Sequence, residues 1–533
     1  MSTLTLPLAG TRLLLHASLR HDGRLFAPWV AAVTVLSASS VLFYPFVFPD
    51  QADRLALSAT IGANPALGLI FGPARDLSTV DGFNAWRSLA LGGFLVALGA
   101  IFAVVRATRA QEDSGQAELL ASGVVGRSSR LMTGVGIALL GSVAAGLVAG
   151  LVTVLFGGEG ETSMLLGVTF TATGWMLAAV AAVTAQVAGE ARTASSLAVG
   201  ALGAMYLLRG FATSLDLPSW TIWVNPLGWT LETRPASGDH WSPLLLAVAF
   251  TVALVAVAFV LQGRRDFGQG SIAQRPGPAR GATRSPGRLA LRLNAGPVLT
   301  WTVAFGMLGV VFGYFVASVD DLFSGDAGVQ QILASGATTP DELTAAFVRT
   351  ILSLIGIIAA LPGVQVLLKV RAEELADRVE PVMAGAVARP RYYASNVLLG
   401  LGSSTVYVLL AGALVALLAS RADVGISFAD ALLQAVATTP AVWTVVAVSV
   451  AVVGAGPTAS LAAWVGVLLS FGLTLLGPTF GLDDWVLGIS PFWHVPSVTA
   501  ADPDWSGLGW VSLVTVVLLV VGFAGLRRRD LAR

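Results

Sequence analysis

The chain has 533 residues, of which 55% are hydrophobic and 12% are charged. Soluble globular chains carry roughly 25% charged residues, so this composition excludes an ordinary soluble protein. The formal net charge of +0 excludes a typical nucleic-acid-binding protein, because such proteins need a clustered excess of basic residues.

Apolar blocks about 20 residues long recur along the chain, which is the length that a helix needs to cross a hydrocarbon core roughly 30 Å thick. The first six blocks predict spans at 25–45, 85–105, 131–155, 163–186, 194–213 and 243–263. Six more predict spans at 298–318, 345–368, 393–419, 427–453, 459–476 and 508–526. The sequence therefore predicts an all-α integral membrane protein with twelve transmembrane helices.

Basic residues gather on one side of these predicted spans. If residue 1 lies inside, most of the 31 Arg and Lys residues fall in cytoplasmic segments, where such residues are enriched. Acidic pairs such as Asp320-Asp321 and Asp483-Asp484 then fall in outer loops. We expect a multi-pass protein with both termini in the cytoplasm.

The sequence of the first half recurs in the second half. Four charged residues after the second span, Arg109, Glu112, Glu118 and Arg127, recur after the eighth span as Arg371, Glu374, Glu380 and Arg389. An Arg-Arg-Asp run follows both the sixth span and the twelfth. Because six spans are an even number, both halves have the same orientation, as in transporters with parallel repeats. We predict two tandem six-helix halves with parallel pseudo-twofold symmetry, at 1–263 and 298–533.

Each predicted half begins with basic residues spaced four apart. In 8–22 these are Arg12, His16 and Arg20, and the same spacing recurs within 283–294. On a helix such residues share one face, so both segments are predicted to lie in the membrane interface. The segment 264–297, rich in Arg, Gly and Pro, is predicted to be a cytoplasmic linker that includes the second interfacial helix.

Charges of both signs are concentrated after the second and eighth spans. On a helix, Glu112 can pair with Arg109, and Glu374 with Arg371 and Arg378. Such a loop taken alone is most simply a solvated helical hairpin without a partner. Because it occurs twice, we predict that it docks onto a symmetric cytosolic dimer. The predicted docking residues are Arg109, Glu112, Asp113, Glu118, Arg127, Arg371, Glu374, Asp377, Glu380 and Arg389.

The chain lacks the sequence motif with which many ATPases bind the phosphates of ATP. Its only lysine is Lys369, so it lacks a GxxxxGK[ST] phosphate-binding loop. It has no cysteine, and its four histidines are scattered, so we expect no catalytic residue, no metal site and no cofactor bound by this chain. If ATP drives this protein, a partner chain hydrolyses it.

The Arg-Ala-x-Glu pattern after the second span, the run from Asn225 to Trp229 and the Arg-Arg-Asp ending of each half resemble membrane subunits of type-two ABC exporters. The chain is most similar to the actinobacterial group that exports polyketide antibiotics such as tetronasin, over essentially its whole length. The resemblance implies a permease in a bacterial cytoplasmic membrane that works with two copies of a separate nucleotide-binding ATPase subunit, which carries ATP and Mg.

The resemblance also implies where the functional segments lie. Coupling helices would fall at 112–118 and 374–380, and interfacial helices at 8–22 and 283–294. Re-entrant extracellular loops would hold Pro226 and Trp229 in the first half, and Pro491 and His494 in the second. The halves differ at some matching positions, since Gly115 corresponds to Asp377 and Trp229 to His494.

We therefore expect a translocating subunit, not itself an enzyme, that exports a lipophilic compound: an antibiotic, a drug-like molecule or a lipid. An ion-coupled transporter of the major facilitator type is the main alternative, and a membrane-embedded enzyme is another. Ion coupling usually needs charges within the bilayer, but no predicted span has Asp or Glu near its centre. Arg87, Arg209 and Arg349 sit near span ends, where snorkelling of the side chain to the membrane surface explains them.

Candidate residues of the substrate pathway are the aromatic side chains Phe94, Phe102, Trp175, Tyr206, Phe305, Tyr314, Tyr407 and Trp464. Each of them is explained equally well by packing or by contact with lipid.

Overall fold

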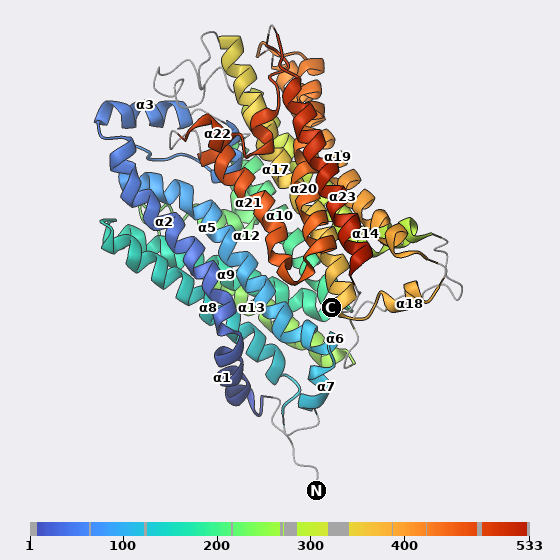
Figure 1. The fold of residues 1–533 in the computed structure, drawn as a ribbon. Coiled ribbons are helices and arrows are strands. Elements are labelled where there is room, and N and C mark those ends of the chain that lie inside the picture. Colours follow the sequence, from blue (N-terminus) through green and yellow to red (C-terminus); the bar gives the residue numbers. More distant parts are fainter. Residues whose placement is uncertain are drawn as a thin grey trace. The chain divides into compact units, whose positions relative to one another are not determined.

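The computed structural model describes residues 8–62, 65–121, 125–214, 217–266, 270, 285–317, 340–385, 387–422, 424–476, 482–500 and 502–529. Within these residues all regular elements are helices, and twelve of the helical segments are long and apolar enough to cross a membrane (Figure 1). The prediction of an all-α protein with twelve spans is confirmed. The chain divides into two compact units, Met1–Gly277 and Pro278–Arg533.

The first unit contains six of the spans. They are α2 (Ala27–Val47), α5 (Val80–Val105), α8 (Ser129–Leu155), α9 (Gly160–Val187), α10 (Ala191–Ser214) and α13 (Pro243–Arg264). Helix α9 is the most deeply buried and packs against α5, α8, α10 and α13, while α2 packs against α5 and α8. Because α9 has helix neighbours on most sides, it forms the centre of this unit.

Small residues allow α8 and α9 to approach closely. A Cβ atom on Gly146 would lie 2.1 Å from the carbonyl oxygen of Gly167, and one on Gly167 would lie 2.3 Å from the carbonyl oxygen of Gly146. No side chain fits in that space. The two backbones are therefore in direct contact, which is how helices gain packing energy in a bilayer, where water does not drive their association.

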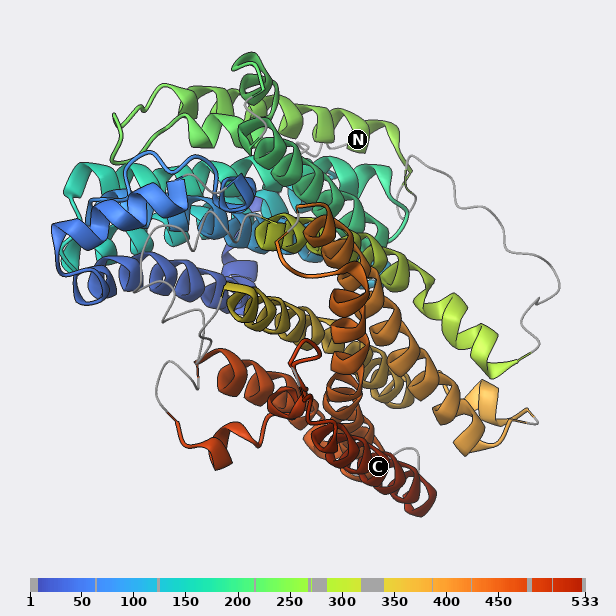
Figure 2. The ribbon, with the colours of Figure 1, turned by 90° about the horizontal axis from the view of Figure 1, so that it is seen from above.

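The second unit contains the other six spans. They are α14 (Pro286–Ala317), α17 (Pro340–Leu375), α19 (Arg389–Arg421), α20 (Phe428–Ala455), the segment Pro457–Thr474 and α23 (Ser506–Arg528). Helices α20 and α23 lie side by side, and α19 packs against α14, α17 and α20 (Figure 2). These pairs correspond in chain order to the pairs that pack in the first unit.

The eleventh span is irregular. A 3₁₀ segment (Pro457–Trp464) precedes the short α21 (Val465–Phe471), which is followed by a π-helical turn (Gly472–Leu476). Ala459, inside the 3₁₀ segment, has non-helical backbone angles (φ −98°, ψ 38°), which mark a kink. The regular hydrogen-bond ladder is therefore interrupted where the sequence predicted one plain helix.

The predicted interfacial segments have different structures in the two units. Residues 8–22 contain α1 (Thr11–Asp22), which packs against α8, and the Ser129 hydroxyl donates to the carbonyl of Ala9 at 2.6 Å. In the second unit, residues from Pro286 onward belong to α14, so this segment is continuous with the seventh span. Half of the predicted linker, including residues 283 and 284, lies outside the described residues. The interfacial position of both segments stays a prediction.

Short helices stand where the re-entrant loops were predicted. In the first unit these are α11 (Trp220–Val224) and α12 (Pro226–Leu231), and Asn225 between them caps α12 by accepting from the Leu227 amide at 3.0 Å. The Trp229 indole donates to the Trp223 carbonyl at 2.7 Å. In the second unit they are α22 (Asp484–Leu487) and a 3₁₀ turn (Pro491–His494), where the His494 Nε2 lies 2.8 Å from the Gly488 carbonyl. Their entry into the membrane stays a prediction.

Candidate functional site

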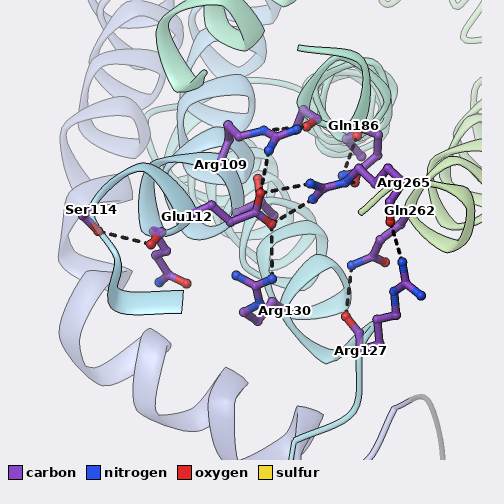
Figure 3. Close-up of polar contacts among 12 residues, drawn as sticks. Arg109, Glu112, Ser114, Arg127, Arg130, Gln186, Gln262 and Arg265 are labelled. Atoms are coloured by element: carbon purple, nitrogen blue, oxygen red, sulfur yellow. Dashed lines mark hydrogen bonds and ion pairs between the residues drawn. The ribbon is translucent and has the colours of Figure 1, made fainter. Parts of the chain in front are cut away.

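A buried carboxylate at the end of the second span organises one end of the first unit. Helix α5 ends in a π-helical turn (Arg106–Ala110), and α6 (Gln111–Asp113) follows with Glu112 at its centre. The Glu112 side chain is 4% exposed and contacts three guanidinium groups (Figure 3). Arg265 binds both carboxylate oxygens, at 2.8 and 3.0 Å, while Arg109 lies at 2.6 Å and Arg130 at 3.2 Å.

The same arginines hold the end of α9. The Arg109 Nε donates to the Ala185 carbonyl at 3.0 Å and its Nη2 donates to the Ala188 carbonyl. The Arg265 Nε donates to the Gln186 side chain at 2.7 Å. The last carbonyls of a helix lack partners within the helix and attract positive charge. Glu112 and its arginines therefore join the ends of α5, α8, α9 and α13 into one buried cluster.

A second cluster forms around Glu374 in the last turn of α17. The Glu374 side chain is 1% exposed and accepts from Arg529 Nη2 at 2.9 Å on both oxygens, while Arg371 lies at 3.3 Å. The Arg529 Nε donates to the Gly454 carbonyl at the end of α20, at 3.1 Å. The predicted pairs of Glu112 with Arg109 and of Glu374 with Arg371 are confirmed. The other ion partner of Glu374 is Arg529 and not Arg378.

Secondary contacts correspond in the two clusters, with one difference. Arg127 donates to the carbonyl of Arg265, and Arg389 lies 3.5 Å from the carbonyl of Arg529. Where the first unit has Arg130, three residues after Arg127, the second has Tyr392, three after Arg389. The Tyr392 hydroxyl donates to Glu373 at 3.0 Å. Glu112 thus contacts three arginines and Glu374 contacts two.

The clusters are electrostatically strong because they are dry and directly hydrogen-bonded. Hydrogen bonds between ionised groups are roughly twice as strong as neutral ones, and a bidentate arginine–carboxylate pair also fixes orientation. The gain offsets the cost of removing the charges from water only while every partner is present. Each cluster can therefore act as a rigid joint that moves the attached helix ends together.

The ten predicted docking residues divide into two sets. Arg109, Glu112, Arg371 and Glu374 are buried in the clusters. The others are exposed: Asp113, Glu118, Arg127, Asp377, Glu380 and Arg389. Of these, Glu118 lies on α7 (Gln116–Ala121) and Glu380 on α18 (Glu380–Met383). Asp113 also accepts from the Ala191 amide at the start of α10, at 2.7 Å.

The turns before these exposed helices share one backbone feature. Gly115 has φ +76° and Asp377, at the corresponding position, has φ +55°. Both lie in the left-handed region, which glycine adopts freely and aspartate tolerates better than most residues. The substitution that distinguishes the two loops thus preserves the turn.

Reasoning from sequence missed Arg130, Gln186, Arg265 and Arg529 as members of the clusters. The signal that could have found Arg265 and Arg529 is the repeated Arg-Arg-Asp run. A charged pattern that recurs at the end of both halves indicates that its arginines pair with corresponding residues in each half. Arg130 and Gln186 have no counterpart in the second unit that makes the same contact, so the repeat does not single them out.

The predicted pathway aromatics form separate groups. Phe94 meets Tyr206 edge to face at 5.4 Å between ring centres, and Phe305 stacks on Tyr407 at 5.0 Å. The Trp175 indole donates to the Leu139 carbonyl at 3.1 Å, Trp464 is half-buried, and Phe102 and Tyr314 are exposed. Their contact with substrate stays a prediction.

Arg209 differs from the snorkelling side chain that was expected, and that interpretation is wrong. The residue is 2% exposed, donates to the Ile70 carbonyl at 2.9 Å and lies 4.3 Å from the centre of the Tyr206 ring. Tyr206 donates to the same carbonyl at 2.6 Å. Together they hold the end of α4 (Pro65–Phe71) against α10.

Comparison with known proteins gives two matches. The family model described as "Multidrug efflux system permease Rv1217c, C-terminal domain" matches residues 24–261 and 284–527, one segment in each unit. The multidrug efflux system permease protein Rv1217c of Mycobacterium tuberculosis (strain ATCC 25618 / H37Rv) is 34% identical over 529 residues, which cover 98% of this chain and 95% of the relative.

Proposed function

Because the chain belongs to the family of the multidrug efflux system permease Rv1217c, we propose that it is the membrane-spanning subunit of an ATP-driven exporter of the type-two ABC class. The chain is a multi-pass membrane permease of an efflux system. In the proposal two copies of a separate cytosolic ATPase subunit bind ATP and Mg, and this chain moves a lipophilic compound out of a bacterial cell. The resemblance to tetronasin-type exporters supports a polyketide-like compound as the cargo.

The pair of buried clusters is the observation that carries the proposal. Each one attaches a charged segment, after the second or the eighth span, to the ends of other spans of its unit. These are α8, α9 and α13 in the first unit, and α20 and α23 in the second. A push on α7 or α18 would therefore reach the helix ends without being lost in a flexible loop. Two such clusters, one in each unit, suit a dimer of ATPase subunits that contacts an equivalent surface on each unit.

The matched packing in the two units supports a tandem repeat with a parallel pseudo-twofold axis. It also agrees with a family model that matches one segment of similar length in each unit. In this arrangement both termini and both clusters face the cytoplasm. Glu112 and Glu374 then position the coupling segments, and the exposed Glu118, Asp377 and Glu380 contact the ATPase.

The distribution of acidic residues argues against the major facilitator alternative. Within the twelve spans of the described chain, Asp and Glu occur only in the first or last turns, as at Asp81, Glu161 and Asp430. Proton coupling within the bilayer usually uses a carboxylate at depth. A partner ATPase would supply the energy for transport, so that no carboxylate within the bilayer is needed.

Affinity purification in mild detergent tests the proposal. A soluble ATPase should co-purify at two copies per chain, and the complex should hydrolyse ATP faster when a lipophilic substrate is added. Transport by the isolated chain on an ion gradient, with nucleotide irrelevant, would establish the major facilitator alternative instead.

Charge reversal at the exposed helices tests the docking surface. The double variant Glu118→Arg with Glu380→Arg should release the ATPase subunit, because both contacts lose their charge complementarity. The matched control is Glu161→Arg, an exposed residue at the opposite end of the first unit, which should retain the ATPase. Full retention by the double variant would remove α7 and α18 from the interface.

A further inference from the structure

Two apolar grooves in the first unit lie on either side of one buried side chain. The first, of about 220 Å³, lies between the first two spans and is lined by Trp29, Gly99 and Phe102 among others. The second, of about 550 Å³, lies between the first and third spans and extends as far as Val35 and Val148. Phe26 and Ile137 line both grooves.

Two glycines let the side chains of Phe26, which separates the two grooves, and Trp29, which lines the smaller one, pack directly against helix backbones. Phe26 is 6% exposed, and a Cβ on Gly141 would lie 2.6 Å from its ring, so the ring rests on the backbone of α8. A Cβ on Gly99 would lie 2.8 Å from the Trp29 ring, which rests in the same way on α5. The two grooves are therefore fixed features of helix packing.

One arginine lines the smaller groove, and two more are chain neighbours of residues that line the grooves. Arg106 lines the smaller groove, the exposed Arg24 adjoins its lining residue Leu25, and the exposed Arg20 adjoins Leu19 of the larger groove. Neither groove has an Asp or Glu among its lining residues. The site thus combines a cationic end with two apolar channels.

We propose that an anionic phospholipid occupies this site, with one acyl chain in each groove and its phosphate beside Arg24 and Arg106. A ligand with two chains fits a divided groove, whereas a compact drug-sized molecule would fill one side. Basic pockets between transmembrane helices attract anionic headgroups. The absence of a lining carboxylate leaves no partner for the cationic group of a zwitterionic lipid.

Lipid retention measures this binding without any transport assay. The full-length chain is placed in bilayer discs containing equal phosphatidylglycerol and phosphatidylcholine, extracted in mild detergent, and its bound lipids are identified by native mass spectrometry. We expect phosphatidylglycerol to be retained in preference to phosphatidylcholine. Equal retention of the two lipids would overturn the proposal.

Two variants separate the headgroup site from the chain site. Arg106→Gln should lower retention of phosphatidylglycerol by about fivefold, the effect of one interfacial basic residue. Ala144→Trp fills the larger groove while preserving all charges, and it should also lower retention. The control Arg192→Gln removes an exposed arginine outside both grooves and should behave as the unaltered chain. Unchanged lipid retention in either Arg106→Gln or Ala144→Trp would contradict the proposal that one lipid places its phosphate beside Arg106 and an acyl chain in each groove.

Discussion

Glu112 and Glu374 occupy matching places but balance different amounts of charge. Among the described residues, Glu112 holds Arg109, Arg130 and Arg265 together, whereas Glu374 holds Arg371 and Arg529. Buried like charges repel one another when their common counter-ion is lost. The first cluster should therefore depend more strongly on its carboxylate than the second does.

We expect Glu112→Gln to destabilise the protein more than Glu374→Gln. Removing one partner of a buried ion pair typically costs about 3–5 kcal/mol, because it leaves uncompensated charge. Thermal unfolding in detergent, followed by tryptophan fluorescence, should show a lower midpoint for both variants and the larger decrease for Glu112→Gln. The exposed Glu118→Gln is the control and should leave the midpoint unchanged. An equal decrease in both cluster variants would mean that Arg130 adds nothing to the first cluster.

At the scale of helices, close backbone contact distinguishes positions that the sequence leaves alike. Gly146 and Gly200 both lie within predicted spans, but only Gly146 faces a neighbouring backbone, whereas nothing lies within 4 Å of a Cβ on Gly200. Periodicity does not separate them, because glycine is common throughout these helices.

The substitution Gly146→Ala should force α8 and α9 apart, since its methyl group would overlap the Gly167 carbonyl. We expect a clear loss of folded protein, measured as the monodisperse fraction in size-exclusion chromatography. Gly200→Ala should be neutral or slightly stabilising, because alanine is better than glycine in a helix by roughly 1 kcal/mol. Tolerance of alanine at Gly146 would mean that the α8–α9 contact is looser than described.

At the scale of the whole molecule, the proposed parallel repeat fixes which loops face the same side. The chain has no cysteine, so a single introduced cysteine is labelled without background. The exposed residues Arg192 and Arg391 belong to proposed cytoplasmic segments, and His240 and Asp502 to proposed outer loops.

A membrane-impermeant maleimide applied to intact cells should label His240→Cys and Asp502→Cys. Arg192→Cys and Arg391→Cys should react only after the membrane is permeabilised. The four variants test both halves, one inner and one outer position in each. Opposite labelling in the second half would mean an inverted repeat and would exclude two like-oriented coupling segments.

The twelve spans could be predicted from the sequence because the bilayer imposes a simple requirement. A helix must be apolar for about 20 residues to cross, and that condition is local in the chain. The pairs Arg109–Glu112 and Arg371–Glu374 were equally accessible, since a spacing of three places both side chains on one helix face. The irregular eleventh span was not predicted, because apolar composition does not reveal how a helix is interrupted.

By itself, then, the sequence determined the all-helical class, the number of spans and the local ion pairs, all of which depend on neighbours within a few turns of one helix. Only the tertiary structure decided that Glu112 and Glu374 are buried, and that Arg265 and Arg529 reach them from far along the chain. It also decided that Arg209 caps α4 instead of reaching for the membrane surface. The physical reason is that burial and long-range pairing depend on which helix ends meet, and no local pattern contains that information.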